Sequence, residues 1–409
     1  MDVGFVITCF RRSNSGKGGH YRSCLTVARA MCRHGHKATI FCLGDFFPEA
    51  LRNEVVEVRL LRVGYFRLRR GLGKLCECLR EYQVDVLHAY NPTAYIYARF
   101  ASAICGVPVV LTKPGGPTIK SSYYPLAKDI IVNSADDESV FLGNQRFSKS
   151  RISLFPNRVD EPVHRVGRVE ELLALLAPNL FSILAISRIT ESKRLLFVQI
   201  LNLADEFRRR SIQFQLIIIG TPDSQMVKDY IEGRLGSESK LLTDLPFTEK
   251  SADYIPAVDC VLGMGRVVME AAACSKPVLV PDCQSNYPRV LDGTSFDAGF
   301  CANFTERASY PKVAAGDALE ILERLARVPG QREGVGTYLR QRFVEDFLID
   351  SIVAKQVGVY ENAVIESKMF TFDQLSHVFD YFFVAVLRLW RRKVRHKLFS
   401  GNPHSINNE

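Results

Sequence analysis

The sequence lacks a paired Cys-x-x-Cys motif, although eleven cysteines occur among its 409 residues. Their odd number and scattered places predict free thiols in a reducing compartment, and Cys76-Glu-Cys78 alone is a poor zinc site. No apolar stretch reaches the roughly 20 residues that a membrane-spanning helix needs. The first residues form an apolar strand pattern without a basic leader or cleavage site, so we expect no signal peptide and a cytoplasmic location.

Familiar nucleotide-binding signatures are also missing. The glycine loop Ser13–His20 is not a P-loop, because Arg11 stands where that motif begins and Gly18 replaces its Ser or Thr. The loop does not match the dinucleotide fingerprint either, which disfavours a dehydrogenase. The basic runs lack interleaved aromatic residues on a sheet and do not match a known reading helix, so we expect no nucleic-acid partner.

The composition is that of a globular protein, with 47% hydrophobic and 24% charged residues, and the length suits two domains. The net charge is +9, and much of the excess lies in Tyr65–Arg70 and Arg388–Lys397. Such runs suit an anionic surface, and charge alone does not distinguish a nucleic acid from a membrane.

Short apolar runs alternate with helical patterns along the chain, which is typical of a parallel α/β architecture. We expect two Rossmann-like, doubly wound domains that face each other across a cleft, since such domains bind ligands at the carboxyl ends of their strands. The predicted boundaries are 1–165 and 170–350, with C-terminal helices in 351–409. The predicted strands are Val3–Phe10, Lys37–Leu43, Val84–His88, Val107–Thr112, Asp129–Asn133, Phe181–Ser187, Phe214–Gly220, Cys260–Gly263 and Pro277–Pro281.

A strand, a glycine turn and a helix between Val258 and Val278 carry the strongest functional signal. Gly263 and Gly265 allow a tight turn with no Cβ to block a ligand, and the helix that follows presents free N–H groups to an anion. Glu270, in the first turns of that helix, is able to accept hydrogen bonds from both hydroxyls of a ribose. The alternative is an ordinary strand–helix unit with one exposed glutamate.

Two cations follow the first predicted strand of the second domain. Arg188 and Lys193 lie just past its end, where fixed positive charge would neutralise a departing diphosphate. The next strand ends at Gly220 in another tight turn. Surface cations that merely cap a turn are the alternative interpretation.

In this order and spacing, the motifs resemble the nucleotide-sugar-dependent glycosyltransferases of the GT-B fold, specifically family 4. The resemblance implies C-terminal helices that cross back to the first domain. It also implies a retaining transferase that needs no cofactor or divalent metal, and the chain has no Asp-x-Asp pair. It implies that Arg188 and Lys193 bind the diphosphate, that Glu270 holds the ribose, and that Gly220, Gly263, Gly265 and Arg266 complete the donor site. The motifs are Ser187-Arg188-x4-Lys193, Gly263-x-Gly265-x4-Glu270-Ala-x-Ala, Lys276-Pro277-Val278, Ser15–His20, Asp85-Val-Leu-His88 and Pro156-Asn157-x-Val-Asp160.

Two positions depart from the family pattern. A second glutamate, which meets the transferred sugar in family members, is replaced here by Leu262, and a common His-x-His becomes His88-Ala-Tyr90. The resemblance implies a glycan or lipid-linked glycan transferase in cell-surface polysaccharide or glycolipid synthesis, and two alternatives stay open, of which the departures support the first. One is a non-catalytic GT-B-like partner or scaffold. The other is a nucleotide-sugar epimerase, although the loss of a carboxylate at position 262 argues against proton chemistry.

The first domain supplies the candidate acceptor side. His88 is a candidate for a polar contact with the sugar or acceptor, although a histidine near a strand end is often structural. Two glycine loops at the same sheet edge expose backbone N–H groups, and simple turns are their alternative interpretation. Their candidate residues are Gly16, Lys17, Gly18 and Gly19 in one loop and Lys113, Gly115 and Gly116 in the other.

The C-terminal segment predicts a basic amphipathic helix. From Leu375 its apolar residues fall on one helical stripe, and Arg and Lys crowd its last turns, between Arg388 and Lys397. The early part is expected to pack on the first domain. The basic, Trp-containing end predicts peripheral association with an anionic membrane surface, near a lipid-linked acceptor.

Overall fold

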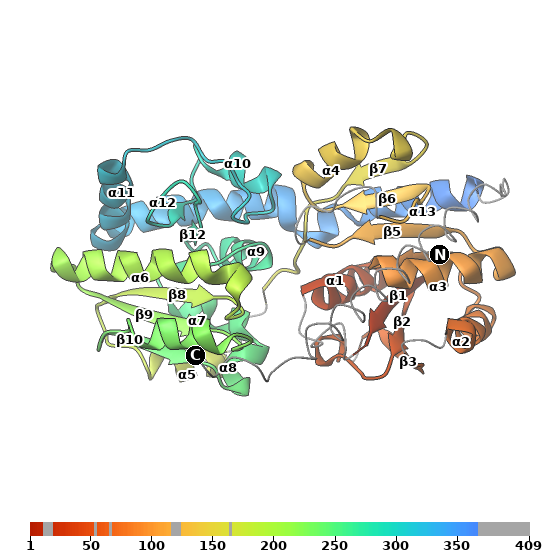
Figure 1. Ribbon diagram of the computed structural model, residues 1–409, viewed down its shortest axis with the longest axis horizontal. Helices are drawn as coiled ribbons and strands as arrows, with labels where there is room; N and C mark the ends of the chain where they lie inside the picture. The colour runs from red at the N-terminus through yellow and green to blue at the C-terminus, as the bar shows by residue number, and fades with distance from the viewer. Residues whose placement is uncertain (11–18, 53–54, 65–67, 116–123, 163–165, 367–409) are drawn as a thin grey trace, which may run out of the picture. The chain divides into compact units, whose positions relative to one another are not determined.

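A computed structural model describes residues 1–10, 19–52, 55–64, 68–115, 124–162 and 166–366 (Figure 1). The chain divides into two compact units. Unit 1 comprises Met1–Val132, Asp137–Ser153 and the segment from Ala354 onward, and unit 2 comprises Asn133–Asp136 and Leu154–Val353.

Unit 1 is built on a seven-stranded sheet in the order β3-β2-β1-β4-β5-β6-β7. The pairs from β3 through β6 are parallel, and strand order reverses between β1 and β4. Almost every residue of β1 is buried, as expected for a strand covered on both faces. The strands are β1 Asp2–Cys9, β2 Lys37–Gly44, β3 Glu57–Arg62, β4 Val86–Ala89, β5 Val109–Lys113, β6 Asp129–Val132 and β7 Arg151–Leu154.

The helices around this sheet include α3, whose ends are set by local sequence. The Asn91 side chain accepts a hydrogen bond from Ala94 N at 2.7 Å, Pro92 occupies the first turn, and Gly106 closes the helix at φ 76°. The helices of this part of the chain are α1 Gly19–Arg33, α2 Leu68–Glu81, α3 Pro92–Cys105, α4 Ala135–Leu142 and α13 Val353–Glu366.

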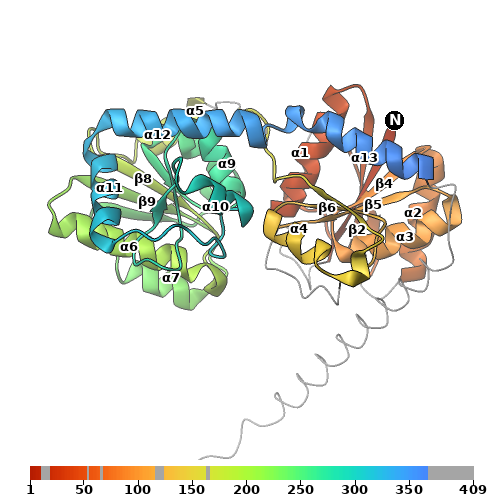
Figure 2. The same cartoon turned by 90° about the horizontal axis from the view of Figure 1, so that it is seen from above.

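Helix α13 brings the chain back to unit 1, from Ala354 onward. Figure 2 shows α13 near β4 and β5. Tyr360 Oη lies 2.7 Å from His88 Nδ1, and Glu366 forms an ion pair with Arg151 at 2.5 Å. The C-terminal crossing expected of the fold is therefore present over Ala354–Glu366, whereas the predicted amphipathic helix lies outside the described residues.

Unit 2 contains a six-stranded sheet in the order β10-β9-β8-β11-β12-β13, with β13 antiparallel to β12 and the other pairs parallel. Strand order reverses between β8 and β11. The strands are β8 Phe181–Ile186, β9 Phe214–Ile219, β10 Ser239–Leu242, β11 Cys260–Leu262, β12 Val278–Val280 and β13 Arg289–Val290. The helices are α5 Val166–Leu173, α6 Arg194–Arg209, α7 Gln225–Glu232, α8 Leu245–Glu249, α9 Arg266–Ala273, α10 Phe296–Cys301, α11 Ala315–Arg327 and α12 Pro329–Arg342.

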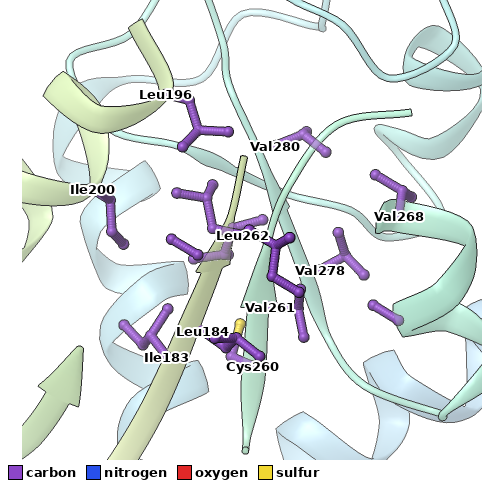
Figure 3. Close-up of a cluster of buried hydrophobic side chains, with 14 of the residues drawn as sticks. Ile183, Leu184, Leu196, Ile200, Cys260, Val261, Leu262, Val268, Val278 and Val280 are labelled. Carbon is purple, nitrogen blue, oxygen red and sulfur yellow. The ribbon is translucent and has the colours of Figure 1, made fainter. Parts of the chain in front are cut away.

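The core of unit 2 fills the space between its central strands and two helices (Figure 3). Leu184 on β8, Leu262 on β11 and Val280 on β12 lie with Leu196 of α6 and Val268 of α9, all of them essentially inaccessible to solvent. This packing fixes the ends of β8 and β11, from which the candidate site extends. None of the helices in the described ranges is long and apolar enough to cross a membrane.

Candidate donor-binding site

The candidate donor residues of unit 2 follow β8 and β11, the two strands between which strand order reverses. Leu262 pairs with Ala185 across these parallel strands, so both strands end at the same edge of the sheet. Arg188 and Lys193 come after β8, and the turn 263–265 comes after β11. Ligands of open α/β sheets bind at such a reversal point, outside the carboxyl ends of the strands.

Glycine is required at both ends of the turn that joins β11 to α9. A Cβ on Gly263 would lie 2.3 Å from Val267 Cγ1, which is too close for any side chain. Gly265 adopts φ 55° and ψ −120°, a conformation that is open essentially to glycine alone. The eight-residue helix α9 begins directly afterwards, so its first N–H groups face the edge of the sheet.

Glu270 is held in place from its own helix. Arg266 Nε donates a hydrogen bond to Glu270 Oε1 at 2.8 Å, and Arg266 Nη1 donates to the carbonyl oxygen of Arg158 at 3.2 Å. Both side chains of the pair are mostly buried, at 18% and 16% exposure. Arg266, which the sequence places in the donor site, thus orients the carboxylate, and Glu270 Oε2 has no hydrogen-bond partner among the described residues.

The two cations after β8 each face a carboxylate. Arg188 Nη1 lies 3.7 Å from Asp223 Oδ2, and its side chain is half exposed. Lys193 Nζ lies 3.5 Å from Glu306 Oε2 and 3.8 Å from the sulfur of Met264, in the turn after β11. Lys193 therefore joins the end of β8 to that turn, where the motifs predict a diphosphate.

Gly220 closes the same edge of the sheet beside Arg188. A Cβ at Gly220 would lie 2.0 Å from the carbonyl oxygen of Ser187, so the end of β9 approaches the end of β8 more closely than any side chain permits. The structure thus brings together the predicted donor residues at one edge of the sheet of unit 2, on the segments that follow β8, β9 and β11: Arg188, Lys193, Gly220, Gly263, Gly265, Arg266 and Glu270.

Leu262 stands at the position where family members carry the second glutamate. Its side chain points into the core of unit 2 and is inaccessible to solvent (Figure 3). Two polar residues that no sequence motif marks, Asn303 and Glu306, lie on the other side of the turn 263–265. Only their proximity in space to Gly265 and Lys193 identifies them.

His88 has a structural environment in unit 1. The ring is fully buried, with Nδ1 2.7 Å from Tyr360 Oη and Nε2 2.6 Å from Thr112 Oγ1. These contacts join β4, β5 and α13. The packing supports a structural role for His88, and its contact with a sugar or acceptor stays a prediction.

The acceptor-side loops are described only in part. Lys113 is the last residue of β5 and is buried, with Nζ 2.6 Å from Asp137 Oδ2, and Gly115 is exposed. Gly19 is exposed at the first position of α1. Gly16, Lys17, Gly18 and Gly116 lie outside the described residues, so their predicted role stays a prediction.

Over the described ranges, no group of three or more His, Cys, Asp or Glu side chains is arranged to hold a metal ion. The cysteines of these ranges are all free.

Comparison with known proteins agrees with this architecture. Residues 17–161 match the family model described as Glycosyltransferase Family 4. A glycosyltransferase structure from Rickettsia africae is 16% identical with a TM-score of 0.66, over 89% of this chain and 98% of that one. HepE from Anabaena in complex with UDP-glucose is 17% identical with a TM-score of 0.62, over 88% and 99%.

An enzyme of another class shares the fold. UDP-GlcNAc 2-epimerase from Neisseria meningitidis, bound to UDP-GlcNAc, is 14% identical with a TM-score of 0.56, over 88% of this chain and 100% of that one. No curated protein matches the sequence. Likeness at these identities establishes the fold, and the family match covers the first part of the chain. The protein therefore has the GT-B fold of nucleotide-sugar glycosyltransferases, and through residues 17–161 it is similar to Glycosyltransferase Family 4.

Proposed function

We propose that the protein is a glycosyltransferase that moves a sugar from a nucleotide-sugar donor to a hydroxyl of a glycan or lipid-linked glycan. We place it in the synthesis of a cell-surface polysaccharide or glycolipid. The observation that carries the proposal is the arrangement of Arg188, Lys193 and Glu270 around the reversal point of the sheet in unit 2.

Each of these residues suits one part of a nucleoside diphosphate. Arg188 and Lys193 supply positive charge where a diphosphate would gain negative charge as its bond to the sugar breaks, and such preorganised charge is a large term in catalysis. Glu270 offers Oε2 to the ribose hydroxyls while Arg266 holds Oε1. The acceptor oxygen bonds to the anomeric carbon as the phosphate oxygen leaves, on the same face of the sugar, with the acceptor proton passing to the leaving phosphate. Charge neutralisation by these side chains fits a reaction that requires no metal.

The similar structures support a nucleotide sugar as the donor, since HepE was crystallised with UDP-glucose. The likeness to an epimerase keeps that activity as the second candidate. An epimerase needs groups that move protons at the sugar, and the core position of Leu262 removes one candidate carboxylate. A non-catalytic partner is the third candidate, and the intact set of Arg188, Lys193 and Glu270 argues against it.

Thermal stabilisation by a panel of nucleotides tests the proposal. The panel contains UDP, GDP and ADP with UDP-glucose, UDP-N-acetylglucosamine, GDP-mannose and ADP-glucose. We expect the nucleotides that carry one particular base to raise the melting temperature of the protein, since a ligand at 100 times its Kd adds about 2.7 kcal/mol to the free energy of unfolding. Product analysis then separates the candidates: a transferase forms nucleoside diphosphate, whereas an epimerase returns an isomeric nucleotide sugar. A protein that no member of the panel stabilises would contradict the donor assignment.

For the lipid-linked acceptor we propose peripheral association with the cytoplasmic face of a membrane. The support is the sequence 388–397, whose Arg and Lys residues would each contribute on the order of 1 kcal/mol at an anionic surface. The full chain is expected to float with vesicles containing anionic lipid at low salt, and to be released at high salt or on deletion of residues 388–409. Failure of the intact chain to bind anionic vesicles at low salt contradicts the membrane proposal and leaves the transferase proposal standing.

A further inference from the structure

A short segment after α10, residues 302–307, lies beside the turn 263–265 of unit 2. Lys193 Nζ contacts both, at 3.5 Å from Glu306 Oε2 and 3.8 Å from Met264 Sδ. A Cβ built on Gly265 would lie 3.6 Å from Asn303 Nδ2, in ordinary van der Waals contact. A carboxylate therefore lies next to the lysine that we assign to the diphosphate, and an amide lies next to the turn that this lysine also contacts.

Asn303 has an unsatisfied acceptor at this place. The residue is 7% exposed, and its buried Oδ1 has no hydrogen-bond partner among the described residues. A buried acceptor without a donor is costly, and in native structures such a group calls for an explanation, such as a bound ion, water or ligand. A hydroxyl of a bound ligand would supply the missing donor.

Packing within unit 2 holds residues 302–307 in a fixed conformation. Asn303 and Phe304 both have positive φ, 52° and 54°, which is unusual for asparagine and rarer still for phenylalanine. Phe304 is fully buried, its ring lies 5.4 Å from that of Phe296, and its N–H donates to Gly299 O at 2.7 Å. This packing sustains an unfavourable backbone conformation, and it fixes Asn303 and Glu306 before any ligand arrives.

We propose that Asn303 and Glu306 recognise hydroxyl groups of the transferred sugar in the donor, in place of the carboxylate that position 262 lacks. The inference rests on the proposed function, because it concerns the sugar attached to the diphosphate at Lys193. Sugar hydroxyls both donate and accept, so they match the free oxygen of Asn303 and the carboxylate of Glu306. Leu262 points into the core, which leaves this segment as the polar neighbour of the turn 263–265.

Binding of a diphosphate and of its sugar ester separates a sugar contact from a structural role. The probes are the nucleotide sugar of the panel that stabilises the protein most and the corresponding diphosphate, and Kd is measured by titration calorimetry. Glu306→Gln and Asn303→Gly should each weaken the sugar ester about ten-fold, as loss of a hydrogen bond to a charged or buried group predicts. The diphosphate should bind Asn303→Gly within two-fold of the wild type. It should bind Glu306→Gln equally well or more tightly, because Lys193 then has no competing carboxylate.

Asn303→Gly preserves the positive φ, and Asn303→Leu, which is close in shape but removes the oxygen that would accept from the sugar, serves as the second variant if the glycine lowers the melting temperature. Glu232→Gln is the matched control, since Glu232 forms an ion pair with Lys228 in α7, away from this segment. If the variants bind the diphosphate and the sugar ester equally more weakly, Glu306 only positions Lys193. If their affinity for the sugar ester is unchanged, neither residue contacts the sugar. Either result overturns the inference while the proposed function stands. If neither probe binds the wild type, the proposed function fails and the inference fails with it.

Discussion

Replacing Lys193 with alanine is expected to lower the rate of sugar transfer by roughly 10²-fold or more, and Arg188→Ala should have a similar effect. Both side chains lie past the end of β8, where their charge matters most as the diphosphate departs. Neither belongs to the core, because Arg188 is half exposed and a quarter of the Lys193 side chain is exposed, with its Nζ near Glu306 and Met264. The melting temperature should therefore change little. The rate of nucleoside diphosphate formation, measured at saturating donor, gives the effect on kcat.

Lys228→Ala is the control for these variants, because Lys228 is a paired lysine of the same unit at 3.2 Å from Glu232. Its loss should leave kcat unchanged. Near-normal transfer by both Lys193→Ala and Arg188→Ala would refute the assignment of these cations to the diphosphate.

The largest expected effect on stability comes from the buried ion pair of unit 1. Lys113→Met leaves the Asp137 carboxylate buried without its cation, and breaking one partner of a buried pair typically costs about 3–5 kcal/mol. Both side chains are only 2% exposed, and their charged atoms are 2.6 Å apart. Native-state hydrogen exchange of the amides in β4 and β5 would measure the loss as a lower free energy of opening.

Two further variants separate the charge effect from simple side-chain truncation. Adding Asp137→Asn to Lys113→Met should recover a substantial part of the stability, because the buried carboxylate that has lost its lysine is then replaced by a neutral amide. Lys128→Met removes a partner of Glu366 in a pair that is 36% and 40% exposed, and surface pairs contribute about 1 kcal/mol or less. If Lys113→Met cost no more than Lys128→Met, the pair would not have the structural role that its burial indicates.

The α/β class and the central strands follow from sequence pattern alone. Runs such as Phe181–Ser187 and Phe214–Gly220 agree with β8 and β9 to within one residue, because a strand buried on both faces is a continuous apolar run. The edge strands β3, β7, β10 and β13 were missed. Their residues are only partly buried or number as few as two, so they carry little of that pattern.

The residues of the candidate site were also predicted only in part. The motifs identify Arg188, Lys193 and Glu270 because each lies at a fixed distance from a strand end, and parallel strands bring such ends together. Lys113 and His88 also lie near strand ends, yet their side chains are buried in pairs formed with Asp137 and Tyr360. Sequence position does not reveal such partners, because they come from other elements. Asn303 and Glu306 were not predicted from the sequence for the same reason.

Titration of the best-binding nucleoside diphosphate into the wild type, Glu270→Gln and Glu232→Gln tests the central claim most directly. Arg266–Glu270 and Lys228–Glu232 are both ion pairs one helical turn apart in unit 2, so the two variants are matched. We predict that Glu270→Gln weakens binding at least about ten-fold, because a carboxylate that accepts from ribose hydroxyls is lost, and that Glu232→Gln binds as the wild type does. Wild-type affinity in Glu270→Gln, or no binding to the wild type, would contradict a nucleotide site at the carboxyl ends of β8 and β11.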